Sequence, residues 1–424
     1  MSKDILFDAI CDIEKWKTYI EKERIKGVNR VVLEYLCDPE VREWVLSQIK
    51  KEKYMIAPPH MAEIPKDEPN KFRTVFVNEP LDRVLLAIIC DCLCELTPHW
   101  VSKYCTSYQK GIGTGKVVQR VQKWIVNSPT ETVGYKTDLS KYFDSVKITF
   151  IDTIFDKFEK EFGHSCVITL LRKYYHMDLC FDLKGNLIHH YQSLKQGCAV
   201  AAWLANVLLY EVDEVMNIVC KGQYVRYSDD MLFICPNYIE AKRVLDKMLN
   251  KYELTLNPKK VEEVRKDKWI KFLGFSIKGE MISISYSRLY KFVKEIKART
   301  VKQIPKDITL TRAIRSVNEF LYGNGEYSWA TSILPVINCE KDVKALSFFV
   351  LDCLKAVATK KYVNRSLGFE HHEDHVITVP HQGKVGSNKK KVGWIAGHKT
   401  IYCIYKDIRY GKGTYETIIR TMGM

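Results

Sequence analysis

The tetrapeptide Tyr227-Ser228-Asp229-Asp230 constrains this chain more than any other stretch. Apolar, β-favouring residues flank it on both sides, so the sequence predicts a β-hairpin with two adjacent carboxylates at its turn. Two ionised aspartates this close repel each other and need a compensating cation. A pair of divalent metal ions would supply that charge and suits phosphoryl transfer. The alternative is a solvated Asp-Asp turn on a surface hairpin, and only the rest of the chain can decide between the two.

A second acidic position lies in the stretch from Gly134 to Val146. The pattern predicts a short strand that ends at Asp138, then a turn and a helix. A carboxylate at this strand end is placed to share metal ions with Asp229 and Asp230 on a neighbouring strand pair. Phe143, five residues further on, falls back toward the same pocket if the chain turns there. The alternative role for Asp138 is the N-cap of the following helix.

Residues 64 to 77 predict a strand, a basic turn and a second strand, and the residues 81 to 96 predict a buried helix. A basic hairpin tip can hold a triphosphate, because the arginine fork matches paired phosphate oxygens. The candidates are Lys66, Lys71 and Arg73. The alternative is a solvated turn of lysine and arginine.

Two further segments predict contacts with a ligand. The glycine-rich run from Ser107 to Lys116 precedes a helix at residues 117 to 126, and its amides could bind a nucleic-acid phosphate; the alternative is a flexible connection. Residues 148 to 180 are predicted to be helical, with a hairpin turn at 182 to 186. Gln196-Gly197 then precedes an apolar helix rich in small residues, and the open question is whether Gln196 faces a ligand.

The segment after the hairpin becomes basic. A helix is predicted at 241 to 252, a turn at Asn257 to Lys260, and a strand pair that joins Phe272 to Phe275 with Met281 to Ile284. From Ser285 onward, basic side chains alternate with tyrosine and phenylalanine in a pattern that suits a grip on a nucleic-acid backbone. The alternative for these helices is a solvated basic face.

The overall composition favours a nucleic-acid partner. The net charge of +15 and the pI near 9.0 indicate a polyanion, and no apolar run reaches the ~18 residues needed to span a bilayer, so no membrane association is predicted. The fourteen cysteines and the lack of a secretion signal predict reduced thiols and a cytoplasmic location. Cys90, Cys92 and Cys94 lie in the predicted buried helix, which favours packing over zinc, and the cluster His371 to His375 is read as a solvated loop rather than a metal site.

Taken together and in this order, these motifs resemble reverse transcriptases. The order is Arg73 in a basic hairpin, Asp138 with Phe143, Gln196-Gly197, the Tyr227 to Asp230 turn, Asn257 to Lys260, and Phe272 to Phe275, with Asp138 and Asp229 separated by 91 positions (229 − 138). The resemblance covers roughly residues 56 to 285 and is nearest to bacterial defence-associated enzymes that work with a noncoding RNA. Retron and group II intron enzymes are the nearest competitors.

The resemblance implies an α+β fold shaped as a right-hand polymerase. Its parts would be fingers, a palm made of an antiparallel sheet backed by helices, and a helical thumb. The expected boundaries are a helical N-terminal extension at 1–55, fingers and palm at 56–284, thumb at 285–370 and a basic tail at 371–424.

The family's functional residues carry over position by position. Asp138, Asp229 and Asp230 would be catalytic and would bind two Mg²⁺ ions, with Mn²⁺ as an alternative. The incoming nucleotide would contact Arg73, Lys66, Lys71, Phe143, Gln196, Tyr227 and Lys260, with Phe143 excluding a 2′-hydroxyl and Lys260 as an acid near the pyrophosphate. The primer grip would be Phe272, Leu273, Gly274 and Phe275. Nucleic acid would bind Arg288, Lys291, Lys294, Lys389, Lys390 and Lys391.

Two positions depart from the family pattern. Lys195 stands where proline commonly precedes the glutamine, and Val261 stands where threonine often follows the lysine.

The function implied by the resemblance is RNA-directed DNA synthesis on a structured noncoding RNA template in antiviral defence. The enzyme would consume dNTPs and produce cDNA, and oligomerisation is possible. The alternatives are template-independent or protein-primed synthesis on the same palm, and an RNA-binding scaffold with an inactive polymerase core.

Overall fold

The computed structural model describes residues 3–65, 72–109, 111–129, 134–190, 192–323, 328–360, 364–367, 369, 377–380, 398 and 400–410. The chain divides into two compact units. The first is formed by Met1–Lys110 with Val133–Glu263, and the second by Gly111–Thr132 with Val264–Met424. All fourteen cysteines carry free thiols. None of the described helices combines the length and apolar character that crossing a bilayer requires.

The first unit begins with helices whose starts are set by capping side chains. Asp4, Asp12, Asn29 and Asp38 each accept a backbone N–H in the first turn of the helix that follows, which satisfies a donor that has no partner within the helix. The helices are α1 (Ile5–Ile10), α2 (Ile13–Ile25), α3 (Arg30–Cys37) and α4 (Pro39–Lys50).

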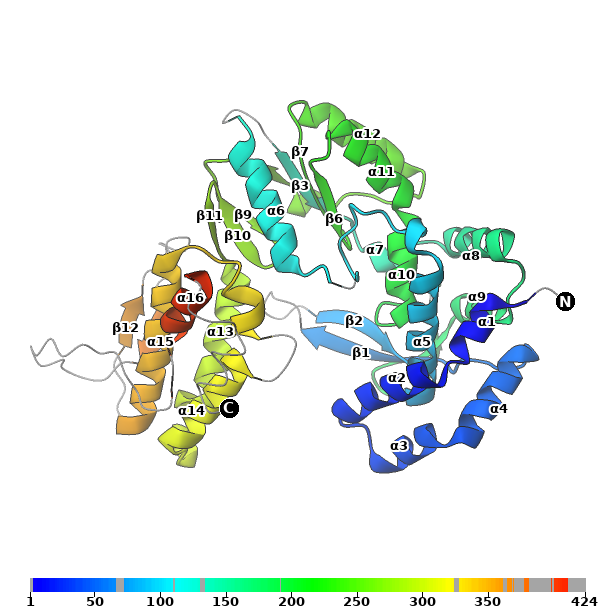
Figure 1. Ribbon diagram of the computed structural model, residues 1–424, viewed down its shortest axis with the longest axis horizontal. Helices are drawn as coiled ribbons and strands as arrows, with labels where there is room; N and C mark the ends of the chain where they lie inside the picture. The colour runs from blue at the N-terminus through cyan, green and yellow to red at the C-terminus, as the bar shows by residue number, and fades with distance from the viewer. Residues whose placement is uncertain are drawn as a thin grey trace, which may run out of the picture. The chain divides into compact units, whose positions relative to one another are not determined.

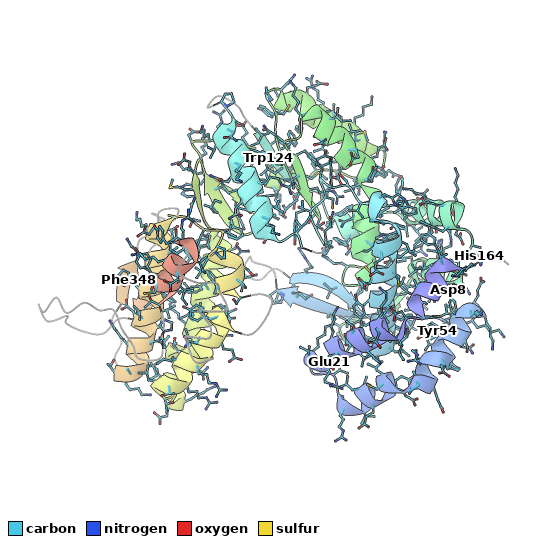
Figure 2. The ribbon with its side chains drawn as sticks, viewed as in Figure 1. Asp8, Glu21, Tyr54, Trp124, His164 and Phe348 are labelled. Atoms are coloured by element: carbon cyan, nitrogen blue, oxygen red, sulfur yellow. The ribbon has the colours of Figure 1, made fainter. Side chains whose placement is uncertain are left out.

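These N-terminal helices pack on α5 (Pro80–Leu96) and α9 (Cys166–His176). The hydroxyl of Tyr54, labelled in Figure 2, donates to the buried carboxylate of Asp82 on α5 at 2.8 Å. Lys15 on α2 forms an ion pair with Asp91 on α5 at 3.2 Å. The N-terminal residues therefore form helices that pack on a larger core. The predicted helix at 81 to 96 is confirmed.

The sheet that carries the acidic residues has the strand order β6-β7-β3-β8. Its strands are β3 (Gly134–Asp138), β6 (Tyr224–Tyr227), β7 (Asp230–Ile234) and β8 (Glu262–Val264), and β7 pairs antiparallel with both β3 and β6. The helices α11 (Tyr210–Val219) and α12 (Tyr238–Asn250) pack against it (Figure 1). The predicted α+β class, with an antiparallel sheet backed by helices, is confirmed.

A second sheet in this unit has the order β2-β1-β4-β5. The predicted pair at residues 64 to 77 forms β1 (His60–Pro65) and β2 (Phe72–Val77), and β4 (Leu179–Phe181) and β5 (Leu187–His189) form a hairpin. The helical prediction was wrong at residues 179 and 180. The side chain of Asp182 accepts the amides of Lys184 at 2.8 Å and Asn186 at 2.9 Å, so the tight turn after Phe181 favours strand pairing over helix.

Helices fill the rest of the first unit, and their apolar faces build its core. Besides α9 they are a 3₁₀ turn, Pro98–Trp100, and the helices α7 (Tyr142–Ser145), α8 (Ile148–Phe162) and α10 (Ala199–Leu208). The apolar helix predicted after Gln196-Gly197 is α10, which packs on α5 and α8.

The second unit combines a small sheet with helices. The sheet order is β11-β10-β9, with β9 (Ile270–Phe272), β10 (Phe275–Lys278) and β11 (Met281–Ile284), and α6 (Thr114–Asn127) packs on β10. The helices α13 (Tyr286–Arg299), α14 (Leu310–Tyr322) and α15 (Glu340–Thr359) contact one another (Figure 1). Short helical turns occur at Val301–Lys306 and Trp329–Ile333, and the C-terminal elements are β12 (Asn364–Leu367), β13 (Ile377–Pro380) and α16 (Ile401–Arg409).

Candidate active site

The predicted hairpin is present. Tyr227 at the end of β6 pairs with Asp230 at the start of β7, so Ser228 and Asp229 form its turn. Ser228 has a φ of 58°, in the left-handed region. The flanking strands are buried, with Val225, Met231 and Leu232 all at 0% exposure, so the alternative of a solvated surface hairpin is wrong.

Strand β3 brings the third aspartate to this turn. Asp138 is the cross-strand partner of Asp230, and the amide of Leu139 donates to the carbonyl of Asp229 at 3.2 Å. The alternative role of Asp138 as a helix cap is wrong, because the residue that precedes α7 is Lys141. Asp138 therefore meets Asp229 and Asp230 at one end of the sheet, although 91 positions separate it from Asp229 in the sequence.

The electrostatics of this site are those of crowded acids. Burial raises the pKa of Asp230 to about 6, and the negative charge of Asp229 adds to the shift. Burial also raises the pKa of Asp229, with a further contribution from Asp138, while the charges of Lys260 and Arg73 oppose it. A cation at this edge would stabilise the ionised form of all three side chains.

Lys260 supplies one positive charge. Its ammonium group donates to Oδ2 of Asp138 and forms an ion pair with it. The turn that carries Lys260 is also bonded to β3 through the backbone, since the amide of Asn257 donates to the carbonyl of Asp138 at 2.8 Å. The predicted turn at 257 to 260 is a short 3₁₀ helix, Pro258–Lys260. Burial works against the charge on Lys260, but the bond to Asp138 and the nearby aspartates raise its pKa.

The donor set suits a hard divalent cation. Asp138 Oδ1 is buried and has no hydrogen-bond partner among the described residues, so one carboxylate oxygen is available for a ligand. All three side chains offer oxygen, which is the ligand type of Mg²⁺. In the part of the chain that the structure describes, no three acidic, histidine or cysteine side chains are already arranged around a metal position. A cation could approach Oδ1 of Asp138 directly, whereas at Oδ2 it would compete with Lys260.

Arg73 lies on the second sheet of the same unit. It is exposed on β2, opposite Ile64 on β1. Its positive charge acts on Asp229, which indicates that this strand and the acidic turn share one electrostatic environment. Lys66 and Lys71, the other predicted phosphate contacts, lie outside the described residues.

The Gln196-Gly197 segment is fastened to the same strand. The amide of Phe76 on β2 donates to the carbonyl of Gln196 at 2.7 Å. Gly197 has a φ of 111°, and a Cβ at this position would lie 2.7 Å from the carbonyl oxygen of Phe76. Only glycine permits that approach without a shift of the backbone.

The backbone conformation at position 195 accounts for the lysine that stands there in place of the family's proline. Its φ is 49°, a conformation that the proline ring cannot adopt. The side chain is buried, with Nζ donating to the carbonyl of Met177 at 2.8 Å. The lysine therefore ties this loop to the end of α9, and the backbone here differs from one with proline at that position.

Phe143 lies on α7, directly after the strand that ends at Asp138. It is partly buried, and its carbonyl accepts the amide of Leu194 at 3.2 Å. Its neighbour Tyr142 is fully buried and donates to the carbonyl of Ala205 at 2.7 Å, which fixes the short helix to α10. The ring of Phe143 packs edge-on against that of Tyr142, with centroids 5.6 Å apart.

Comparison with known protein families agrees with this arrangement. The family model described as "Reverse transcriptase (RNA-dependent DNA polymerase)" matches residues 64–277, just over half of the 424 residues. The chain belongs to the reverse transcriptase family. None of the curated protein sequences matches it at the level of significance required.

Among solved structures, this reverse transcriptase is similar to yeast telomerases. The telomerase from Candida albicans, solved with a TWJ fragment of telomeric RNA, has a TM-score of 0.40 and 11% identity over 76% of this chain and 63% of that chain. The apo telomerase from Candida tropicalis has a TM-score of 0.43 and 13% identity over 72% of this chain and 57% of that chain. The reverse transcriptase thus spans about three fifths of the length of these telomerase chains.

The predicted primer grip of this reverse transcriptase is a turn rather than a strand. Phe272 ends β9 and Phe275 begins β10, while Leu273 and Gly274 between them have φ values of 49° and 79°. The prediction of a strand through all four residues was wrong because Leu273 adopts the left-handed conformation despite its side chain. The strands on either side pair with each other, and β10 pairs with β11 as predicted.

The predicted nucleic-acid-binding residues fall into two groups. Arg288 stacks on the ring of Phe275 at 4.2 Å and donates to the carbonyl of Leu273 at 3.4 Å, so its guanidinium braces the turn. Lys291 and Lys294, further along α13, are exposed. Lys389, Lys390 and Lys391 lie outside the described residues, as does the cluster from His371 to His375.

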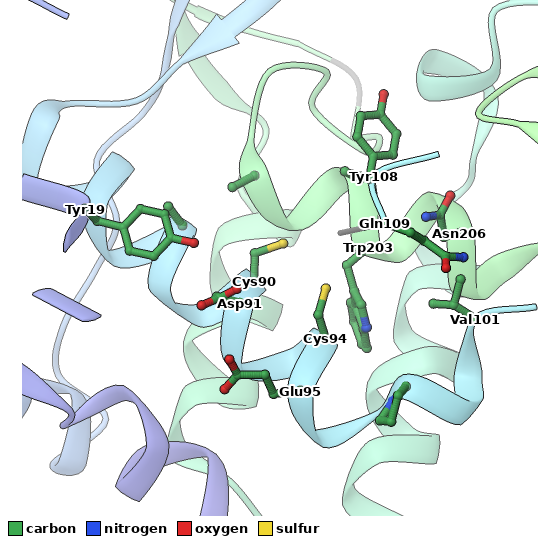
Figure 3. A pocket seen from close by; sticks show the side chains of 14 residues that line it. Tyr19, Cys90, Asp91, Cys94, Glu95, Val101, Tyr108, Gln109, Trp203 and Asn206 are labelled. Carbon is green, nitrogen blue, oxygen red and sulfur yellow. The ribbon is translucent and has the colours of Figure 1, made fainter. Parts of the chain in front are cut away.

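A cavity of about 410 Å³ lies in the first unit among α2, α5 and α10 (Figure 3). Its lining includes Tyr19, Cys90, Cys94, Tyr108 and Trp203. Cys92, by contrast, is fully buried in the core. The three cysteines considered for zinc are therefore split between a cavity wall and the protein interior.

The sequence reasoning missed Asp213 and Arg226, which form a buried ion pair directly behind the acidic turn. One signal was available. Arginine in a strand of otherwise buried apolar residues requires an acidic partner, since a buried charge without one is too costly.

Proposed function

We propose that this chain is an RNA-directed DNA polymerase that copies a structured noncoding RNA into cDNA, in the cytoplasm, as part of bacterial antiviral defence. The observation that carries the polymerase assignment is the cross-strand pairing of Asp138 with Asp230 beside Asp229, with Lys260 bonded to Asp138. Membership of the reverse transcriptase family supports the same activity. The RNA template and the defence role rest on the sequence resemblance and on the net charge of +15.

The chain's own residues have distinct tasks in this proposal. Arg73, exposed on β2, holds the triphosphate of the incoming dNTP through its planar fork. Phe143 limits the space beside the sugar. Lys260, whose pKa is raised by its acidic neighbours against the effect of burial, stays protonated and can give a proton to the departing pyrophosphate. Asp138, Asp229 and Asp230 would hold two Mg²⁺ ions, and bound there the ions would favour ionisation of the primer 3′-hydroxyl and offset the charge of the leaving group.

The bonds that change are those of nucleotidyl transfer. The primer O3′ attacks the α-phosphorus of the dNTP, the new phosphodiester bond forms, and the bond to the bridging oxygen of pyrophosphate breaks. The hydroxyl proton leaves to solvent, and the pyrophosphate oxygen takes a proton from Lys260. Burial raises the pKa of Asp230 to about 6, and positive charge at the site would lower it again and favour the ionised carboxylate.

The test is sequencing of the RNA and DNA that copurify with the protein, beside an Asp229→Ala, Asp230→Ala double variant. One abundant RNA in both samples, with complementary DNA only in the wild type, is the expected result and identifies the template. DNA unrelated to any copurified RNA would instead indicate untemplated or protein-primed synthesis. RNA with no DNA that depends on the aspartates would indicate an RNA-binding scaffold.

A further inference from the structure

A fully buried ion pair lies behind the acidic turn. Arg226 on β6 and Asp213 on α11 both have side-chain exposures of 0%. The contact is bidentate, with Nε to Oδ1 at 2.8 Å and Nη2 to Oδ2 at 2.7 Å. The hydroxyl of Tyr224 also donates to Oδ1 of Asp213 at 2.8 Å. The carboxylate of Asp213 therefore neutralises the charge of the guanidinium. The guanidinium acts on other residues through its remaining hydrogen-bond donors.

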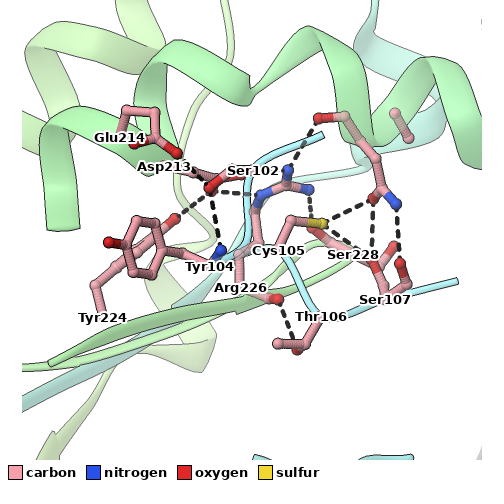
Figure 4. A network of polar contacts seen from close by, with 12 residues as sticks. Ser102, Tyr104, Cys105, Thr106, Ser107, Asp213, Glu214, Tyr224, Arg226 and Ser228 are labelled. Atoms are coloured by element: carbon pink, nitrogen blue, oxygen red, sulfur yellow. Dashed lines mark hydrogen bonds and ion pairs between the residues drawn. The ribbon is translucent and has the colours of Figure 1, made fainter. Parts of the chain in front are cut away.

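The remaining donors of Arg226 reach the backbone of two other elements. Nη1 donates to the carbonyl of Ser228 at 3.1 Å, and Nη2 donates to the carbonyl of Asn206 on α10 at 3.2 Å (Figure 4). Ser228 is the left-handed residue of the acidic turn. Its carbonyl belongs to the peptide group that leads into Asp229, so the guanidinium fixes the orientation of that peptide.

The backbone of Arg226 is fixed as well. Its amide donates to the carbonyl of Tyr104 at 3.0 Å, and its carbonyl accepts the amide of Thr106 at 2.8 Å and the hydroxyl of Thr106 at 3.0 Å. The side chain of Asn206 joins the same segment, donating to the carbonyl of Ser107 at 2.9 Å. Arg226 is thus held from both sides while it holds the turn (Figure 4).

Stability alone does not account for this pair. Burial of two charges costs several kcal/mol per ion, and well-packed apolar residues of similar volume are often as stable or more stable. A strained turn persists only where its surroundings over-determine it. The bond from Arg226 to Ser228 is the contact of the ion pair that acts directly on the turn.

We propose that Arg226 and Asp213 are positioning residues that fix the Ser228–Asp229 peptide and thereby aim the carboxylate of Asp229. Asp213 acts through Arg226, by orienting its guanidinium so that Nη1 meets the carbonyl of Ser228. This inference rests on the proposed function for its effect on catalysis. It predicts a loss in turnover and in cation binding that is separate from any loss of folding.

The decisive variant replaces the charges by apolar groups of similar size. Asp213→Leu, Tyr224→Phe and Arg226→Met together remove the ion pair without leaving the tyrosine hydroxyl or either charge unpaired. We expect the variant to stay folded, because removal of the buried charges offsets the donors that the carbonyls of Ser228 and Asn206 lose. At saturating dNTP we expect kcat to fall about 10- to 100-fold with KM for dNTP nearly unchanged, because a misplaced catalytic group costs that much.

Mn²⁺ binding provides a readout that does not depend on turnover. The electron paramagnetic resonance of free Mn²⁺, titrated with the full chain, measures the affinity directly. We expect the triple variant to bind Mn²⁺ about tenfold more weakly than the wild type, and the Asp229→Ala, Asp230→Ala variant to bind it more weakly still. Arg172→Met, which breaks an ion-pair cluster with Asp152, Asp156 and Glu159 elsewhere in the unit, is the matched control and should change neither value.

Each result of these measurements either supports or overturns the positioning role. A folded triple variant with wild-type kcat and Mn²⁺ affinity overturns the inference. If the triple variant does not fold, Arg226→Lys decides: it keeps the positive charge beside Asp213 but loses the fork that spans to Ser228, so a wild-type kcat and Mn²⁺ affinity in that variant overturns the inference too. A wild-type protein that incorporates no nucleotide contradicts the proposed function, while a weaker Mn²⁺ affinity in the variants would still support the positioning role.

Discussion

The ammonium group of Lys260 forms an ion pair with the carboxylate of Asp138, the residue that ends β3. In the absence of divalent ions this contact is the one positive charge bonded to the acidic cluster among the described residues. Lys260 therefore places positive charge beside the three aspartates that we propose as metal ligands, and it would compete with a metal ion for Oδ2 of Asp138.

Lys260→Met tests this relationship through stability. The variant removes the cation bonded to Asp138 and leaves only the weaker effects of Arg73 and Lys136. We expect the free energy of unfolding without divalent ions to fall by only about 1 kcal/mol, because the lysine side chain is largely exposed. Mg²⁺ should close most of that gap. Thermal melts with and without MgCl₂ measure it, and Lys259→Met on the same turn is the control. Equal Mg²⁺ shifts in the wild type and the Lys260 variant would contradict the prediction.

Phe143→Ala should relax the choice of sugar. In the proposed function this ring, which packs against Tyr142, limits the space beside the sugar, so its removal would make room for a 2′-hydroxyl. We expect the ratio of kcat/KM for dNTP over rNTP to fall by at least about tenfold. Phe150→Ala, whose ring packs on Tyr252 outside the candidate site, is the control. An unchanged ratio in the Phe143 variant would show that the steric assignment is wrong.

Gly197→Ala should disturb the loop that carries Gln196. A new Cβ would lie 2.7 Å from the carbonyl of Phe76, and the φ of 111° adds strain. Gly185→Ala is a matched control, because its φ is also positive, at 83°, but open space surrounds the new Cβ. We expect the free energy of unfolding to fall by about 1 kcal/mol in Gly185→Ala and by about 2–3 kcal/mol in Gly197→Ala. Only Gly197→Ala should also raise the KM for dNTP. Denaturant unfolding and steady-state kinetics measure both, and equal losses would rule out the close contact.

The acidic site was predictable from sequence because its signals are local. Tyr227 to Asp230 lies between β-favouring runs, and a short strand was predicted to end at Asp138, so the three carboxylates could be placed at strand ends. The register that pairs Asp138 with Asp230 depends on tertiary structure, so the sequence alone could not predict it. The positive φ angles of Lys195 and Leu273 could not be predicted either, because lysine and leucine disfavour this conformation and nothing in the sequence indicates it.

The three consecutive lysines at 389 to 391 give a prediction about RNA affinity. Lys389→Ala, Lys390→Ala and Lys391→Ala together remove three positive charges from the tail. If they contact phosphates, log Kd should depend less steeply on log salt, by up to about 0.7 per lost contact with single-stranded RNA. Filter binding of the copurifying RNA across a salt series measures the slope. Unchanged affinity and slope would remove this segment from the interface.

His398 gives the fold a dependence on pH. Burial lowers the pKa of its imidazole from 6.5 to about 4, and Nδ1 lies 2.8 Å from Oδ1 of Asn318. Nε2 is buried and has no hydrogen-bond partner within the described residues, so protonation there would create a buried N–H donor without an acceptor. Because the unfolded chain takes up the proton first, the stabilising effect is complete above pH 6.5 and is lost as pH falls toward 4. We expect the free energy of unfolding to fall between pH 7.5 and pH 5 by about 2 kcal/mol more in the wild type than in His398→Gln. Denaturant titrations at the two pH values measure this difference, and parallel losses in both proteins would show that His398 is not the group responsible.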